Sequence, residues 1–154
     1  MRLVRVEGGR ESSLALSMFG ERLALCRLEA EGEMPAWATR AWFYSVTRTP
    51  DELSVVCPEG EVPDGVKHER GWRALKLKGL FDLSLVGIVV SVAEPLAEVE
   101  INILAIATYE TDYLLVKEER LELAASTLTD ADMFSGGIRG MSRDHIYRTR
   151  EEVC

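Results

Sequence analysis

Apolar and polar residues change their spacing between Trp72 and Leu128, and each spacing predicts a different element. Residues 75–78 alternate apolar and charged, which predicts a strand with one solvated face. From residue 84 to residue 99 the apolar positions recur at steps of three and four, which predicts a helix lying on a sheet. The residues of this apolar stripe are Leu85, Ile88, Val89, Val92, Leu96 and Val99.

The next stretch predicts two further strands and a second helix. Residues 101–108 are rich in β-favouring residues and uncharged, and a polar break at 109–111 separates them from a short strand at 112–117. Residues 118–128 return to helical spacing, with Leu121, Ala124, Ala125 and Leu128 on one side. The order strand, helix, strand, strand, helix is most of a βαββαβ unit.

The first half of the chain predicts a reduced version of the same unit. We expect strands at 23–28, 42–48 and 53–57, one helical turn at 34–37, and a loop at 59–65 that contains one proline and two glycines. Residues 44–60 can be laid on 104–119 with one extra residue in the turn, which places Thr47 opposite Thr108. The sequence therefore predicts a degenerate unit at 1–65, a second unit at 66–130, and a tail or atypical closing segment at 131–154.

Composition restricts the classes of partner. The formal net charge of −8 argues against nucleic acid and against an anionic membrane surface. No apolar run reaches the ~20 residues that a membrane helix needs, and the start, MRLVRVEGG, lacks the apolar core of a signal peptide. We therefore expect a cytoplasmic protein with no membrane partner.

The cysteines and histidines predict no metal site. Cys26, Cys57 and Cys154 show no CxxC spacing, and His68 and His145 complete no usual zinc pattern. We expect two buried thiols and one terminal thiol, and no cofactor.

Two acids stand where a small ligand could bind. Asp82 lies at the predicted helix start, where free backbone N–H groups and the helix dipole favour an anion, but helix capping alone also explains this residue. Asp112 ends the polar break, and ordinary turn chemistry also explains it. No nucleophile, nearby histidine or assignable oxyanion donor accompanies them, so an enzyme is the weakest of the hypotheses.

Three segments together resemble a known family. They read WFYSVTRTPDELSVVCPE, ERGWRALKLKG, and FDLSLVGIVVSVAEPLAEVEINILAIATYETDYLLV. They are similar to the small two-ACT-domain proteins, which are related to aspartokinase regulatory regions and to the arginine-sensing CASTOR proteins. The resemblance covers roughly residues 23–128.

The resemblance implies an α+β fold of two ferredoxin-like ACT units side by side, with antiparallel sheets and helices on one face. It implies no catalysis and a free amino acid bound at an interface between ACT units, a basic amino acid being one candidate. It also implies a homodimer or a protein partner. When the family's motifs are matched to this sequence, the implied ligand contacts lie in two segments. The loop before the first predicted helix supplies Leu80, Phe81, Asp82 and Leu83, and the turn between the two following strands supplies Thr108, Tyr109, Thr111 and Asp112.

Two functions therefore compete. The first is a regulatory module that binds an amino acid, and the second is a ligand-free structural or protein-interaction module with the same fold. The pairing of Asp82 with Asp112 favours the first, since a module without ligand needs no acid at both places. A small enzyme on a ferredoxin-like sheet remains the third hypothesis, because a fold alone does not exclude catalysis.

Overall fold

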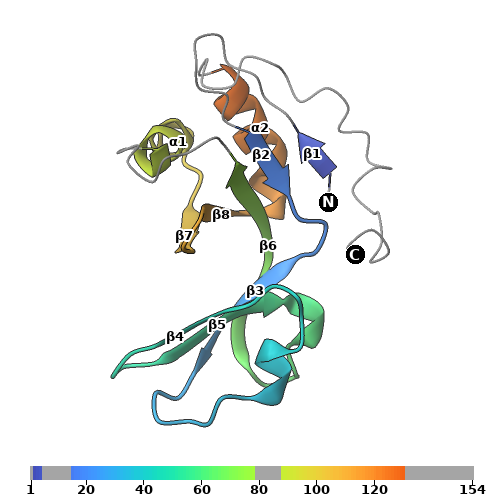
Figure 1. The fold of residues 1–154 in the computed structure, drawn as a ribbon, viewed down its shortest axis with the longest axis vertical. Coiled ribbons are helices and arrows are strands. Elements are labelled where there is room, and N and C mark those ends of the chain that lie inside the picture. The colour runs from blue at the N-terminus through green and yellow to red at the C-terminus, as the bar shows by residue number, and fades with distance from the viewer. Residues whose placement is uncertain (1, 5–14, 79–87, 131–154) are drawn as a thin grey trace. The chain divides into compact units, whose positions relative to one another are not determined.

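The structure is a computed structural model, and it describes residues 2–4, 15–78 and 88–130 (Figure 1). The chain divides into two compact units. Glu21–Trp72 form one, which we call the inserted unit, and Met1–Gly20 together with Arg73–Cys154 form the other, which we call the outer unit.

The inserted unit is a four-stranded antiparallel sheet with two short 3-10 turns. In chain order it contains β3 (Leu23–Leu28), η1 (Ala36–Thr39), β4 (Ser45–Arg48), β5 (Leu53–Pro58), η2 (Glu59–Glu61) and the first part of β6 (Lys67–Lys78). The strand order is β6-β3-β5-β4. The predicted strands at 23–28 and 53–57 are confirmed, whereas the helical turn begins two residues later than predicted and the loop at 59–65 opens with η2.

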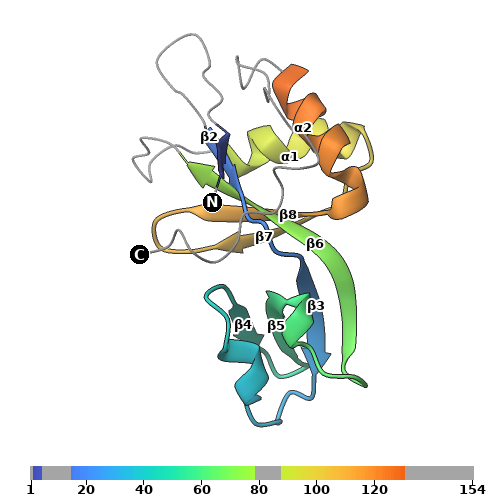
Figure 2. The same ribbon diagram turned by 90° about the vertical axis from the view of Figure 1, so that its right-hand side faces the viewer.

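The outer unit has one sheet with both α-helices on the same face (Figure 2). It contains the last part of β6, α1 (Ile88–Glu98), β7 (Ile103–Ala107), β8 (Asp112–Lys117), η3 (Glu118–Arg120) and α2 (Leu121–Asp130). The N-terminal strands β1 (Arg2–Val4) and β2 (Ala15–Met18) belong to it as well. The strand at 112–117 is confirmed to the residue, and the predicted helix at 118–128 begins with the turn η3.

The N-terminal strand β2 stands where a βαββαβ unit has its closing strand. β2 pairs antiparallel with β6, Ala15 opposite Lys78 and Met18 opposite Leu75, and β8 also pairs with β6. The outer sheet therefore has the order β2-β6-β8-β7, with β1 beside β2. In the outer unit, the first strand of the unit pattern is β6, and its neighbour β2 comes from the chain before the inserted unit. In the inserted unit, the first strand is β3, and its neighbour is the first part of β6, the strand that continues into the outer unit.

A buried arginine fixes the end of β2. Arg73 is 1% exposed and donates to the carbonyl oxygen of Phe19 from Nη2 at 2.8 Å and from Nε at 3.3 Å. Its Nη1 donates to Glu118 Oε1 at 3.1 Å. Because Glu118 opens η3, one guanidinium joins the N-terminal segment, β6 and the start of the second helical segment.

The residues after α1 end the helix with a Schellman motif. The N–H of Glu100 donates to Ala97 O at 3.0 Å, and the N–H of Ile101 donates to Leu96 O at 2.9 Å. Glu100 has a φ of 57°, in the left-handed region that this motif requires. The usual apolar contact is present, because Ile101 and Leu96 share one core cluster.

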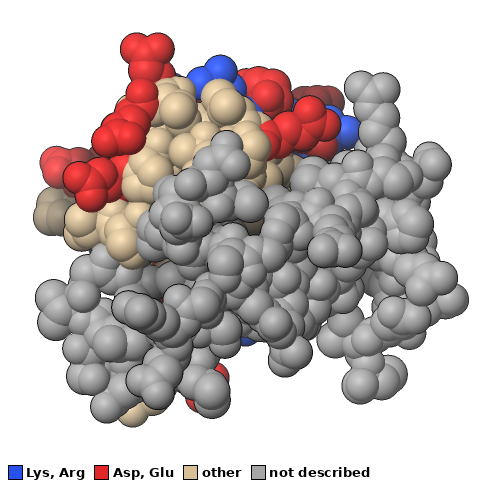
Figure 3. All heavy atoms as spheres, turned by 90° about the horizontal axis from the view of Figure 1, so that it is seen from above, with Lys and Arg blue, Asp and Glu red and all other residues tan. Residues whose placement is uncertain are grey.

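The face that α1 and α2 present to solvent is acidic. Glu94, Glu98 and Glu122 are exposed, and neither helix contains a lysine or arginine. Figure 3 shows more acidic than basic side chains among the described residues of the face that it draws. In the described ranges no helix is long and apolar enough to cross a membrane.

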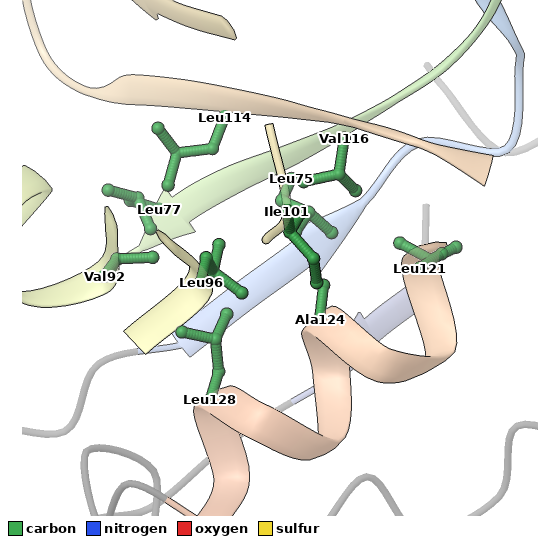
Figure 4. Close-up of a cluster of buried hydrophobic side chains, with 10 residues drawn as sticks. All are labelled: Leu75, Leu77, Val92, Leu96, Ile101, Leu114, Val116, Leu121, Ala124 and Leu128. Atoms are coloured by element: carbon green, nitrogen blue, oxygen red, sulfur yellow. The ribbon is translucent and has the colours of Figure 1, made fainter. Parts of the chain in front are cut away.

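The core of the outer unit lies between the two helices and the sheet (Figure 4). Val92 and Leu96 of α1 point toward residues of the strands and of α2, as the helical spacing predicts. Val89 and Val99 pack beside this cluster and are partly exposed. The side chains of Leu85 and Ile88 lie outside the described part of the structure. The whole cluster is Leu75, Leu77, Val92, Leu96, Ile101, Leu114, Val116, Leu121, Ala124 and Leu128.

Candidate functional site

The β7–β8 turn carries four of the eight predicted ligand residues. The N–H of Thr108 donates to Thr111 O at 2.8 Å, and the Thr108 hydroxyl donates to the same oxygen at 2.8 Å. The N–H of Thr111 donates to Thr108 Oγ1 at 3.3 Å. The turn is thus closed by both backbone and side chain, which leaves Tyr109 at its tip 88% exposed.

This turn is attached to the end of β6. The Thr111 hydroxyl donates to the carbonyl oxygen of Leu77, the last but one residue of β6. Asp112 follows, half-buried and paired in register with Ala107. The predicted ligand site lies between this turn and the segment that follows β6. Leu77 is next to the last residue of β6 and therefore lies close to the start of that segment in the sequence.

The other four predicted ligand residues cannot be placed. Leu80, Phe81, Asp82 and Leu83 lie outside the described residues, so their place relative to the turn stays a prediction. Among the described residues, Thr108 and Thr111 are joined by hydrogen bonds and Asp112 adjoins them.

The inserted unit contains the same turn. The N–H of Thr49 donates to Glu52 O at 2.9 Å, and the N–H of Glu52 donates to Thr49 Oγ1 at 3.2 Å. Both hairpins therefore have four-residue turns that begin with threonine, and Thr49 corresponds to Thr108. The predicted alignment of Thr47 with Thr108 is wrong, because it placed an extra residue in a turn that has none.

The residues after the two hairpins correspond as well. β5 and β8 each have six residues, and each is followed by a 3-10 turn that starts with glutamate. Glu59 accepts the N–H of Gly71 at 3.1 Å, whereas the equivalent Glu118 accepts from Arg73. Each glutamate thus binds a part of β6, so the two hairpins resemble each other in these side-chain contacts as well.

Two arginines lie beside the Thr49–Glu52 turn, which is the turn of the inserted unit that corresponds to the turn of the candidate site. Arg27 Nε donates to Glu52 Oε2 at 2.9 Å, and the Ser54 hydroxyl donates to Glu52 Oε1 at 2.7 Å. The Ser54 hydroxyl and the Arg27 guanidinium hold the pKa of the Glu52 carboxyl below its ordinary value. Arg48 donates to the carbonyl oxygens of Ala30 and Gly32. Sequence reasoning passed over both arginines, and only the correct turn alignment could have found them.

The described cysteines are structural. Cys26 and Cys57 are fully buried in the core of the inserted unit, as predicted, and Cys154 lies outside the described residues. The Cys57 thiol donates to Cys26, which lowers the pKa of Cys26 and raises that of Cys57. Within the described residues no group of three or more His, Cys, Asp or Glu could hold a metal ion.

Two family models match the chain. The model of the ACT domain matches residues 67–130, and a model of an N-terminal domain matches residues 21–65. The putative human protein CASTOR3P is 31% identical over 105 residues, which are 59% of this chain and 64% of that protein. The human cytosolic arginine sensor for mTORC1 subunit 1 is 29% identical over 105 residues, 58% of this chain and 31% of the sensor. The chain thus spans less than two thirds of both relatives.

Solved structures show the same fold. Protein Atu0741 from Agobacterium tumefaciens is 38% identical, with a TM-score of 0.73 over 76% of this chain and 87% of that one. The ligand-free regulatory subunit of aspartate kinase from Thermus thermophilus is 14% identical, with a TM-score of 0.55 over 77% of this chain and 97% of that one. At that identity the second likeness concerns the fold alone.

Proposed function

Because the chain belongs to the same family as protein Atu0741 and carries an ACT domain over residues 67–130, we propose that it is a non-catalytic regulatory module that binds a free amino acid. One relative is named as a cytosolic arginine sensor, which supports an amino acid as the ligand. The observation that carries the proposal is the β7–β8 turn, closed by Thr108 and attached by Thr111 to the end of β6, with Asp112 beside it.

The proposed site contains the eight residues of the two segments. Backbone groups of Thr108 and Tyr109 bracket the ligand, and Asp112 and Asp82 are the acids for its ammonium group or a basic side chain. An α-amino acid needs N–H donors and an acid close together, and a charge-assisted hydrogen bond contributes roughly 1.5–3 kcal/mol. The members from before the helix are Leu80, Phe81, Asp82 and Leu83, and those from the turn are Thr108, Tyr109, Thr111 and Asp112.

Along the sequence, we place this site in the segment 66–130, after a reduced segment at 1–65 and before a tail at 131–154, and the compact outer unit takes β2 from the first of these segments. The boundary between the two matching family models, at residues 65 and 67, supports the first division. The cytosolic relative supports a place in the cytoplasm.

The amino acid is found by a thermal-shift screen, in which a ligand at 100 times its Kd stabilises the fold by about 2.7 kcal/mol. Asp112→Ala should then weaken binding about tenfold or more in calorimetric titration and leave the unfolding free energy nearly unchanged. Glu110→Ala is the matched control, since it removes an exposed acid from the same turn. Unchanged affinity in Asp112→Ala would move the site elsewhere.

The alternative is a ligand-free structural or protein-interaction module. It keeps the same fold and turn, and it predicts no stabilisation by any free amino acid at millimolar concentration. That result in the screen would favour it over the binding module.

We also propose that the protein acts as a homodimer or with a protein partner. Among the described strands, β7 pairs with β8 alone and β4 with β5 alone, and open sheet edges favour further strand pairing. Light scattering should give a mass above that of one chain, and a monomer at all concentrations would contradict the homodimer.

A further inference from the structure

The strand β7 lacks the features that usually protect a sheet edge. Among the described strands it pairs with β8 alone. Its five residues, Ile103–Ala107, are all apolar and include neither a charge nor a proline. The register with β8 is continuous over all five pairs, so no β-bulge turns the strand away. An open apolar edge of this kind favours pairing with a further strand.

The other described edges carry charged residues. β4 contains Arg48 and is followed by Pro50, and both disfavour the addition of a strand. β1 has only three residues and begins with Arg2. The first part of β6, at the edge of the inserted unit, contains Lys67 and Arg70. Of these described edges, β7 is therefore the one best suited to pairing.

The hairpin turn fixes which backbone groups of β7 point to its open side. The N–H of Thr108 donates to Thr111 O at 2.8 Å, so these two residues form a hydrogen-bonded pair. Such pairs alternate with non-hydrogen-bonded pairs along an antiparallel ladder. Leu104 and Ile106 therefore direct their N–H and C=O groups to β8. The residues that direct these groups to the open side are Ile103, Ala105 and Ala107.

We propose that β7 pairs antiparallel with β7 of a second copy of the chain, with Ala105 on the twofold axis. The three outward-facing residues are spaced evenly about Ala105, so this register gives every one of their N–H groups a partner. Ile103 then lies opposite Ala107 of the partner subunit. The inference rests on the proposed homodimer and names the strand that forms it.

The side chains of β7 suit this register. Ala105 meets its own copy at the axis, where a small uncharged side chain causes neither a clash nor like-charge repulsion. The pairing of Ile103 with Ala107 places a large side chain opposite a small one. Ala105 and Ala107 are both exposed, so a partner strand can reach them without any rearrangement of the core.

Charges placed on the axis test the register. In Ala105→Lys and in Ala105→Asp, two like charges would meet on side chains whose Cβ atoms are ~5 Å apart. Each variant alone should dissociate about tenfold or more readily than the wild type, measured by analytical ultracentrifugation over a concentration series. An equimolar mixture of the two should form dimers again, because lysine then faces aspartate.

The matched control places the same charges at the other exposed alanine of β7. Ala107→Lys and Ala107→Asp face Ile103 of the partner subunit and not each other, so mixing them should restore nothing. A mixture of the Ala105 variants that stays dissociated, or an Ala107 mixture that associates in its place, would overturn the register.

Hydrogen exchange of the wild type tests the same contact without a substitution. The outward amides of β7 should exchange about tenfold or more slowly in the dimer than after dilution to the monomer. By the same alternation, the bond from the N–H of Thr49 to Glu52 O directs Val46 and Arg48 to the open side of β4. Their amides should exchange equally fast at both concentrations.

Two results of the exchange experiment would contradict the pairing of β7, and they separate it from the proposed homodimer. A dimer whose outward β7 amides exchange as fast as in the monomer would overturn the contact and leave the homodimer standing. A monomer at all concentrations would overturn both. The thermal-shift screen decides amino-acid binding independently of either result.

Discussion

At the scale of single residues, Arg73 is the charged side chain that is most deeply buried among the described residues. It is a full charge at 1% exposure, and its donors contact Glu118 and the carbonyl of Phe19. A buried charge is tolerated only when it is paired and hydrogen-bonded. Here the same contacts hold the N-terminal segment against β6, so the charge also fixes the course of the chain.

Arg73→Met should lower the unfolding free energy by about 2–4 kcal/mol, because the substitution leaves Glu118 and the Phe19 carbonyl without their donor. Arg27→Met is the matched control, since Arg27 and Glu52 form an exposed ion pair, and exposed pairs contribute about 0–1 kcal/mol. Urea denaturation measures both. Equal effects would mean that Arg73 contributes no more than a surface charge.

At the scale of elements, the two hairpins have the same turn geometry although their sequences differ. Both use a threonine to close a four-residue turn, and both lead through a six-residue strand into a turn that starts with glutamate. The segments between the first and second strands of the two units differ. The outer unit has α1, whereas the inserted unit has the four-residue η1 at the same place in its order.

The inward face of α1 can be tested with two valines of one helix. Val92 is fully buried, and Val90 is 65% exposed. Val92→Ala should cost about 1–3 kcal/mol through lost burial and a cavity, whereas Val90→Ala should stay within about 0.5 kcal/mol. Chemical denaturation of the two variants gives the comparison, and a neutral Val92→Ala would show that this face is assigned wrongly.

At the scale of the whole molecule, the outer unit is assembled from both ends of the chain. Its helices and three of its strands come from residues 73–130, but β2 beside β6 comes from residues before the inserted unit. Phe19 continues this pairing, since its N–H donates to Ala74 O at 3.1 Å. A fragment that begins at residue 66 therefore lacks a strand of its own sheet.

Deleting residues 1–18 should destabilise the outer unit by about 2 kcal/mol or more, which lowers the melting temperature by roughly 4–8 °C. The loss comes from the unpaired edge of β6 and from the buried surface of Met18. Deleting residues 1–4 removes β1 alone and should have a much smaller effect. A thermal melt in which both deletions match the full chain would show that β2 contributes nothing to the fold.

Of the candidate site, only the turn at 108–112 lies among the described residues, and its ligand contacts stay a prediction. The turn at Thr108–Asp112 was predicted from its polar residues and lies between two strands as expected. The segment Leu80–Leu83 lies outside the described residues, so that half stays a prediction. The arginines of the inserted unit were missed, because which carbonyls Arg48 reaches depends on strands that meet only in the folded sheet.

The sequence by itself determined the elements, because their spacing is a local property. A period of two or of about 3.6 residues follows from the geometry of one segment, so β3, β8 and the inward face of α1 could be predicted from single stretches. Only the tertiary structure decided which strand lies next to β6. Ala15 and Lys78 are far apart in the chain, and the spacing of residues within either segment does not determine with which other strand it pairs. The pairing is fixed by the burial of the shared core and by Arg73, which exist only once the distant segments have come together.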